Sequence, residues 1–341
     1  MSKRIGMQTV KLDSKPRIIS TTSIVGPKEG EGPLAKYFDI VLGDDLNGQD
    51  SFEKAEKTML YTAITESIKK AKLKEEDINY MFSGDLLNQT ISSNYAARDI
   101  NIPFIGLYGA CSTMAESLGL ASMIMDGGFA NYVVASTSSH FSSAERQFRA
   151  PLEMGSQRPP CAQWTVTGAG AMVLGKEGNF PYVTYVTNGK VKDYGINDTN
   201  NMGAAMAPAA VDTIKQHLKD TGRTEKDYDL IATGDLGKIG KKLTEELLKE
   251  YGYDIKDIYM DCGEEIFDCK KQGVNSGGSG CGCSAVVYSG YIYKKILSGK
   301  IKRALIVSTG ALMSPTASFQ GETIPGIAHA VSIEFGGNNH E

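Results

Sequence analysis

Hydrophobic positions along the chain follow two different periods. After Ser51, a residue type that caps helices, apolar residues recur at helical spacing at Met59, Ala63, Ile64 and Ile68. Elsewhere, short apolar runs end in glycine or polar turn residues and predict strands. The predicted helices span 51–73, 111–125, 241–251 and 283–297, and the predicted strands span 78–83, 104–110, 132–137, 230–233 and 304–309. Because the two kinds of element alternate, the pattern predicts an α/β protein with parallel strand pairing.

The second half of the chain resembles the first. A shift of 172 residues places CST at 111–113 on CSA at 283–285, and VAST at 134–137 on IVST at 306–309. Upstream, MFSGDL at 81–86 matches IATGDL at 231–236 with a shift of 150 residues. Coincidence between two generic βα units is the alternative, but the uninterrupted match favours duplication. We predict two duplicated halves, 1–180 and 181–341, that face each other around a pseudo-twofold axis in one compact unit.

Composition narrows the classes of function. The 36 Lys and Arg residues against 40 Asp and Glu residues give a formal charge of −4, and no basic block is interleaved with aromatics, so nucleic acid is not expected as a partner. The polar first residues and the lack of a long apolar window predict neither a signal peptide nor a transmembrane segment. The six cysteines form no C-x-x-C pair, and the four histidines are scattered, so we expect reduced thiols, no metal site and no cofactor.

Two segments are candidates for chemistry. Cys111 stands where a strand meets the start of a helix, where unpaired N–H groups favour a thiolate or an oxyanion. A nucleophile that accepts an acyl group is one interpretation, and a small buried hydrophobe is the other. Its counterpart in the second half, 275–283, reads NSGGSGCGC and allows the backbone to approach a ligand or to cradle an anion. Close packing of two helix starts explains the same glycines, and both interpretations can hold together.

Further segments carry a family resemblance along nearly the whole chain. They are VGPKEGEGPL (25–34), GDLLNQ (84–89), GACST (109–113), TSSH (137–140), AERQFR (144–149), MAPAA (206–210), DTIKQH (212–217), GGSGCGCSAVV (277–287) and TIPGIAH (323–329). On these residues the chain resembles the thiolase superfamily and, within it, a branch of sporulation proteins from spore-forming bacteria. The resemblance implies a thiolase-like five-layer αβαβα fold and a homodimer across a shared sheet.

The same resemblance implies a function in the forespore or spore. It predicts a protein that is soluble or peripheral at the inner spore membrane and that binds dipicolinic acid, alone or as its calcium chelate. The protein would assist uptake of this ligand into the developing spore, together with membrane proteins of the same operon. A further hypothesis is a scaffold protein at the spore membrane whose pocket no longer has a function.

Enzymatic turnover is not expected from the residues present. Condensing relatives activate their cysteine with His and Asn, or with two His. Asn275 resembles the Asn position, but the chain has Gly234 and Asp235 where the family's His should fall. His329 approaches from the C-terminal end or is a core residue. We therefore predict a non-catalytic protein with Cys111 as a vestige, and the alternative is an acyltransferase or condensing enzyme that uses acyl-CoA or an acyl-carrier protein.

Dipicolinate is a flat pyridine with two carboxylates, so its site needs cationic forks or helix-start amides beside an apolar slot. The segment 144–149 supplies Arg146 and Arg149, and the following loop adds Arg158; a solvated charge or an ion pair with Glu145 or Glu153 is the alternative. His140 would add a neutral hydrogen bond at the pocket mouth or serve a structural role, and His217 is expected on an exposed helix face. The predicted ligand-binding set is Cys111, His140, Arg146, Arg149, Asn275, Gly278, Ser279, Cys281 and His329.

Overall fold

Two groups of five strands form the centre of the molecule. The computed structural model describes residues 3–148 and 158–336. The first group follows the order β3 (Arg17–Val25), β9 (Gly168–Gly175), β7 (Val133–Ser139), β5 (Tyr80–Gly84) and β6 (Phe104–Gly106). The second follows the order β10 (Tyr182–Thr187), β15 (Gly326–Glu334), β14 (Arg303–Ala311), β11 (Leu230–Thr233) and β12 (Tyr259–Asp261). Within the residues that the structure describes, strand pairing links the two groups where β10 meets β3, at Tyr182 opposite Arg17.

Strand directions match between the groups. In the first, β7, β5 and β6 are parallel, and β9 runs antiparallel to both β7 and β3. In the second, β14, β11 and β12 are parallel, and β15 runs antiparallel to both β14 and β10. The predicted boundary at residue 180 lies in the connection between β9 and β10. That the halves arose by duplication stays a prediction.

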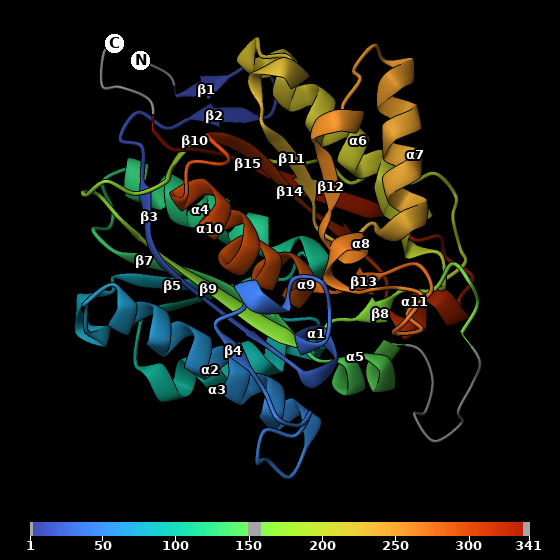
Figure 1. The fold of residues 1–341 in the computed structure, drawn as a ribbon, viewed down its shortest axis with the longest axis horizontal. Coiled ribbons are helices and arrows are strands. Elements are labelled where there is room, and N and C mark those ends of the chain that lie inside the picture. The colour runs from blue at the N-terminus through green and yellow to red at the C-terminus, as the bar shows by residue number, and fades with distance from the viewer. Residues whose placement is uncertain (1–2, 149–157, 337–341) are drawn as a thin grey trace.

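Helices form three layers around the strands (Figure 1). The middle layer holds α4 (Thr113–Asp126) and α9 (Cys281–Val286), which contact strands of both groups. Outside the first group lie α2 (Phe52–Lys70) and α3 (Ile91–Ile100), and outside the second lie α6 (Met202–Thr221) and α7 (Gly237–Glu250). This arrangement confirms the predicted five-layer αβαβα fold.

Shorter elements connect these layers. The strands are β1 (Arg4–Ile5), β2 (Thr9–Lys11), β4 (Ile40–Val41), β8 (Trp164–Thr165) and β13 (Gly278–Ser279), and the helices are α1 (Pro27–Gly30), α5 (Phe141–Phe148), α8 (Cys262–Ile266), α10 (Tyr293–Leu297) and α11 (Pro315–Phe319). Single 3-10 turns span Ala35–Tyr37, Glu75–Asp77, Asn88–Thr90, Ala110–Ser112, Glu225–Asp227 and Lys256–Ile258, and a π-helical turn, Val287–Ile292, joins α9 to α10.

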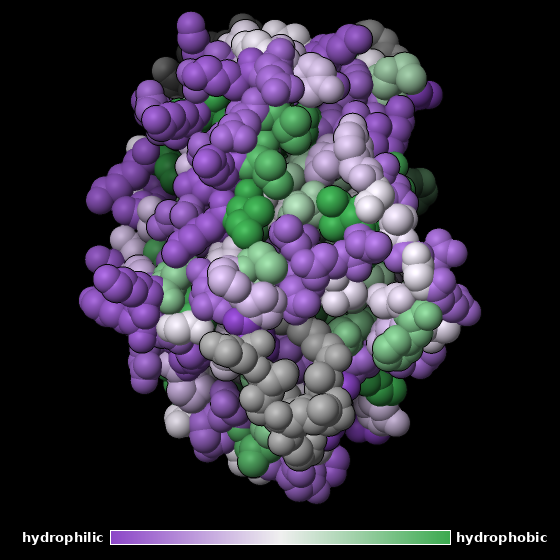
Figure 2. Space-filling view, turned by 90° about the vertical axis from the view of Figure 1, so that its right-hand side faces the viewer, coloured by the Kyte–Doolittle hydropathy of each residue, from purple (hydrophilic) through white to green (hydrophobic). Residues whose placement is uncertain are grey.

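Burial explains why the layers hold together. The Ser51 hydroxyl caps α2 by accepting a hydrogen bond from the Lys54 amide at 3.3 Å, and the predicted apolar face of α2, at Met59, Ala63 and Ile64, is fully buried. One hydrophobic cluster fills the space around α4 and α9, and separate clusters lie under α2 and α6. Viewed from the right of Figure 1, the surface is mostly hydrophilic, with a group of hydrophobic side chains in its upper half (Figure 2). Within the described ranges, no helix combines the length and the apolar character that a membrane crossing needs.

Two sequence expectations need correction. The strand predicted over 104–110 ends at Gly106, because the chain turns before Cys111. His217 is buried on α6 and not exposed: its Nδ1 lies 2.7 Å from the Thr187 hydroxyl and its Nε2 lies 2.6 Å from the Tyr228 hydroxyl. Since α6 packs against β10 and β15 along this face, desolvation lowers the pKa of His217 to about 3.

Candidate functional site

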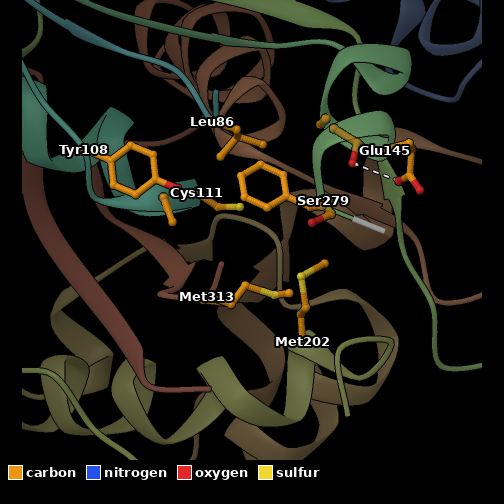
Figure 3. Close-up of a pocket in the computed structure, with 12 residues that line it drawn as sticks. Leu86, Tyr108, Cys111, Glu145, Met202, Ser279 and Met313 are labelled. Atoms are coloured by element: carbon orange, nitrogen blue, oxygen red, sulfur yellow. Dashed lines mark hydrogen bonds between the residues drawn. The ribbon is translucent and has the colours of Figure 1, made fainter. Parts of the chain in front are cut away.

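A pocket opens beside Cys111, between the start of α4 and the start of α9 (Figure 3). Its cavity volume is about 50 Å³, and the empty space reaches about 490 Å³ when the open solvent at its mouth is counted. Leu86, Phe148, Met202 and Met313 supply much of its apolar wall. Its polar lining comes from Tyr108, Cys111, Glu145, Thr165 and Ser279, and Figure 3 shows Met202 and Met313 on the side opposite Leu86.

The turn that carries Cys111 has an unusual backbone. Ala110 has a φ of 49°, in the left-handed region that residues with a side chain rarely adopt. Side chains hold this turn in place: the Ser112 hydroxyl donates to the Gly109 carbonyl at 2.6 Å, and the Thr113 hydroxyl donates to the Ala110 carbonyl at 2.7 Å. Strained backbone of this kind persists where the surrounding structure supports it, and it is common at binding and catalytic sites.

A buried carboxylate lies beside the Cys111 thiol. Asp235, in the turn after β11, accepts hydrogen bonds from the Thr309 hydroxyl at 2.8 Å and from the Gly280 amide at 2.9 Å. The Ser279 hydroxyl and the Cys111 thiol donate to the same group. Burial raises the pKa of Asp235 to about 6 against the opposing effect of these four donors.

The surroundings of Cys111 favour the neutral thiol. Burial raises the pKa of Cys111 well above its usual value, and the negative charge of Asp235 raises it further. Cys281 belongs to the same small hydrophobic cluster as Cys111. Its thiol donates to the Ser138 carbonyl at 2.9 Å, and burial also raises its pKa. Although Cys111 precedes a helix start, the structure therefore does not hold it as an activated thiolate.

The glycine-rich segment reaches the pocket through Ser279. Gly278 and Ser279 form β13, which pairs in parallel with β8, and this pairing brings Ser279 into the lining. Gly278 lies one residue away and accepts a hydrogen bond from the Gln163 amide at 2.7 Å. Asn275 turns elsewhere: its side-chain amide donates to the carbonyls of Arg158 at 3.3 Å and Pro159 at 3.1 Å. Asn275 thus closes a loop and is not among the residues that line this pocket, and its contact with a ligand stays a prediction.

Neither predicted histidine lines the pocket. His140 is fully buried; its Nε2 lies 2.8 Å from the Asp45 carbonyl, and its Nδ1 accepts from the Ser142 amide at 3.1 Å. His329 lies on β15 opposite Ser308 and accepts from the Gly189 amide at 3.3 Å. Burial lowers the pKa of His140, and it lowers that of His329 to about 4. Both rings make packing contacts within the fold outside this pocket, and their contact with a ligand stays a prediction.

The predicted arginines that the structure describes do not gather around the pocket. Arg146 forms an ion pair with Glu53, leaves half of its side chain exposed, and is not among the residues that line the pocket. Arg149 lies outside the described residues. Arg158 pairs with Glu145 at 2.6 Å, the ion pair that was the alternative to ligand contact, and its guanidinium lies 4.9 Å from the ring centroid of Trp164. Because Glu145 lines the pocket, the ion pair with Glu145 places Arg158 at the border of the pocket.

Several pocket residues were not predicted. Leu86 is the last residue of the matched MFSGDL segment, so the repeat itself carried a signal for it, whereas Met313 lies four residues beyond the matched strand. Met202 and Tyr108 had no comparable signal, because only the packing of distant segments brings them together. Among residues 3–148 and 158–336, no group of three or more His, Cys, Asp or Glu side chains is arranged to hold a metal ion.

Comparisons with known proteins agree with this fold. A sequence profile described as "Stage V sporulation protein AD (SpoVAD)" matches residues 6–334. The chain is 47% identical to stage V sporulation protein AD of Bacillus subtilis (strain 168) over 335 residues, which covers 98% of this chain and 99% of that relative. A profile match of this extent, with a relative this similar, establishes the family.

Solved structures with a thiolase-like fold resemble the chain at low identity. The 3-oxoacyl-[acyl-carrier-protein] synthase III from Aquifex aeolicus VF5 has a TM-score of 0.58 at 12% identity, with 94% of this chain and all of that chain covered. A variant of OleA from Xanthomonas campestris has a TM-score of 0.61 at 13% identity, with 94% of this chain and 98% of that chain covered. At this identity the likeness shows the fold alone. The chain belongs to the stage V sporulation protein AD family, whose members are sporulation proteins, and has a thiolase-like fold.

Proposed function

We propose that this chain binds dipicolinic acid in the Cys111 pocket and assists its uptake into the developing spore, without chemical turnover. Membership of the sporulation family supports the biological context. The proposal rests on the residue beside Cys111. A buried carboxylate, Asp235, occupies the position where condensing relatives are expected to carry a histidine. A carboxylate beside the thiol opposes its ionisation, which suits a binding pocket better than a nucleophile.

The chemistry of the pocket lining suits a small planar ligand. Leu86, Phe148 and the two methionines offer an apolar slot for a pyridine ring, and the hydroxyls of Tyr108 and Ser279 border it. The charged side chain in the described lining is Glu145, which Arg158 compensates. Two forms of the ligand suit this lining: the calcium chelate, which carries no net charge, and the free dianion with one carboxylate in contact with Arg158.

Isothermal titration calorimetry tests the proposal. We expect saturable binding of dipicolinate to the wild-type chain, measured with and without calcium. Met313→Trp narrows the pocket, so it should weaken binding by more than about tenfold. Phe319→Trp is the matched control, because Phe319 lies on the same segment but is 91% exposed. Absence of heat from the wild type at millimolar ligand would remove the proposal and favour a scaffold, and equal binding by both variants would place the site elsewhere.

The resemblance supports related proposals for the assembly of this chain. These are a homodimer, a position in the forespore or spore at the inner membrane, and contact with membrane proteins of the same operon.

Acyl transfer through Cys111 is the second candidate. It is favoured by the left-handed turn at the helix start and by the OleA structure described with bound lauric acid and lauroyl-CoA. Since burial and the charge of Asp235 favour the neutral thiol, we expect intact-mass spectrometry to find no acyl adduct after incubation of the wild type with acyl-CoA. Asp235→Asn removes the opposing charge and should increase alkylation of Cys111 severalfold at neutral pH, with Cys111→Ser as the blank. A stoichiometric wild-type adduct would establish the enzyme instead.

A further inference from the structure

A cluster of lysines surrounds two tyrosines where the middle helix layer reaches the surface. The rings of Tyr37 and Tyr291 meet edge to face, with centroids 4.8 Å apart. The ammonium group of Lys36 lies 5.3 Å from the Tyr37 centroid. That of Lys295 lies 5.4 Å from the Tyr37 centroid and 5.2 Å from the Tyr291 centroid. The two rings thus organise cations contributed by segments far apart in the sequence.

Three more lysines complete this group. Lys294 donates to the Tyr37 carbonyl at 2.7 Å and to the Asp39 carboxylate at 2.9 Å, and Lys70 lies 3.3 Å from Asp39. Lys300 is near enough that its charge, after those of Lys295 and Lys36, helps to lower the pKa of Tyr37. We call Lys36, Lys70, Lys294, Lys295 and Lys300 the lysine cluster.

The lysine cluster is poorly compensated. Within residues 3–148 and 158–336, Asp39 is the one carboxylate that forms ion pairs with it. Five positive charges therefore face one negative charge, on a chain whose formal net charge is −4. An excess of positive charge that runs against the sign of the whole molecule indicates a negatively charged partner.

The residue types favour an extended anionic surface over a shaped ligand. The cluster contains no arginine, the side chain whose planar fork recognises single carboxylates or phosphates in a fixed geometry. Lysines are mobile point charges that an anionic lipid surface attracts one by one. Tyrosines suit a membrane–water interface, and Leu297, two residues after Lys295, leaves 42% of its surface exposed. We propose that the lysine cluster docks the protein onto a bilayer of anionic lipids.

This surface is distinct from the proposed ligand site. None of the five lysines lines the Cys111 pocket, so docking onto lipid does not require dipicolinate, and loss of one property need not affect the other. The test therefore measures vesicle binding and ligand binding separately on the same full-length variants.

Vesicle sedimentation gives the direct test. We expect the wild type to bind phosphatidylcholine vesicles that contain about 30% phosphatidylglycerol, to ignore pure phosphatidylcholine, and to dissociate near 1 M salt, where the Debye length is only about 3 Å. The triple variant Lys36→Gln, Lys295→Gln and Lys300→Gln should partition about 100-fold more weakly. The control triple variant Lys242→Gln, Lys249→Gln and Lys256→Gln removes the same charge from other exposed positions and should remain within about threefold of the wild type.

Three results would overturn the docking surface. They are no preference of the wild type for anionic vesicles, equal losses in the two triple variants, and cluster-dependent binding to polyglutamate without binding to vesicles, which would assign the lysines to an acidic protein. Melting curves of both variants should match the wild type, because the substituted side chains lie at the surface. Dipicolinate binding should be unchanged in both variants.

Discussion

Raising the pH from about 6.5 to about 8 is expected to lower the free energy of unfolding by about 2–4 kcal/mol. Glu29 and Glu56 are buried in the folded chain, and desolvation raises the pKa of each from 4.5 to about 8. Burial also raises the pKa of Asp261 to about 7. Over this range the unfolded chain has ionised these carboxyls, whereas the folded chain begins with them largely protonated and holds a larger share of their protons throughout, so unfolding releases protons and rising pH favours it.

Groups whose pKa is lowered on folding change the stability in the opposite direction, and they act mainly at lower pH. Burial lowers the pKa of His217 to about 3 and that of His329 to about 4, so their contribution to stability is lost as the pH falls below the unfolded value of 6.5. Carboxylates with lowered pKa, such as Asp39, contribute above the unfolded value of 3.8 and lose that contribution on acidification. Above pH 6.5 the buried carboxyls therefore determine the sign of the slope.

Urea unfolding at several pH values between 6.5 and 8 measures this slope. Glu56→Gln keeps a neutral side chain of the same shape beside the Ser138 and Ser143 hydroxyls, so the variant should show a clearly shallower loss of stability. Glu250→Gln, at an exposed position, should keep the wild-type slope. If all three proteins show the same slope, Glu56 is ionised in the folded state and the account of its burial is wrong.

Gly310→Ala is expected to destabilise the fold by about 2–3 kcal/mol and to weaken dipicolinate binding. Gly310 lies on β14, directly against the turn that carries Cys111. A Cβ atom there would lie 2.5 Å from the Gly109 carbonyl oxygen and 3.1 Å from the Ser112 nitrogen. Backbone atoms on both sides cannot move independently, so either β14 or the Cys111 turn must shift.

Gly43→Ala is the control for this substitution, because a Cβ at Gly43 meets nothing within 4 Å. Denaturant unfolding should separate the two variants, and calorimetry with dipicolinate should show the loss only for Gly310→Ala. Equal stability of the two variants would mean that the close approach between the halves is not rigid.

Local patterns were sufficient to predict much of the fold. The cap at Ser51 and the apolar face of α2 can be recognised within one short segment, and the repeat matches short segments of the two halves. Elements α2, β7 and β14 therefore lie near their predicted positions. The turn at Cys111 was also foreseen, because strand, small residues and helix follow one another directly in the sequence.

Site geometry depended on contacts between distant residues and was predicted less well. Arg146 pairs with Glu53, 93 positions away, and no local pattern shows which carboxylate an arginine will meet. The sequence shows Asp235 only as a residue in place of an expected histidine, whereas folding brings it within hydrogen-bond distance of the Cys111 thiol. His217 was assigned to the wrong face because α6 is rich in alanine and its apolar side is broad, so burial depends on which strands cover it.

A crystal structure of the wild-type chain with dipicolinate bound tests directly whether the Cys111 pocket is the ligand site. We expect one ligand in this pocket, with its ring between Leu86, Phe148 and the methionines and no covalent bond to the thiol. A ligand bound elsewhere, or an acyl group attached to Cys111 after co-crystallisation with acyl-CoA and dipicolinate together, would contradict this expectation.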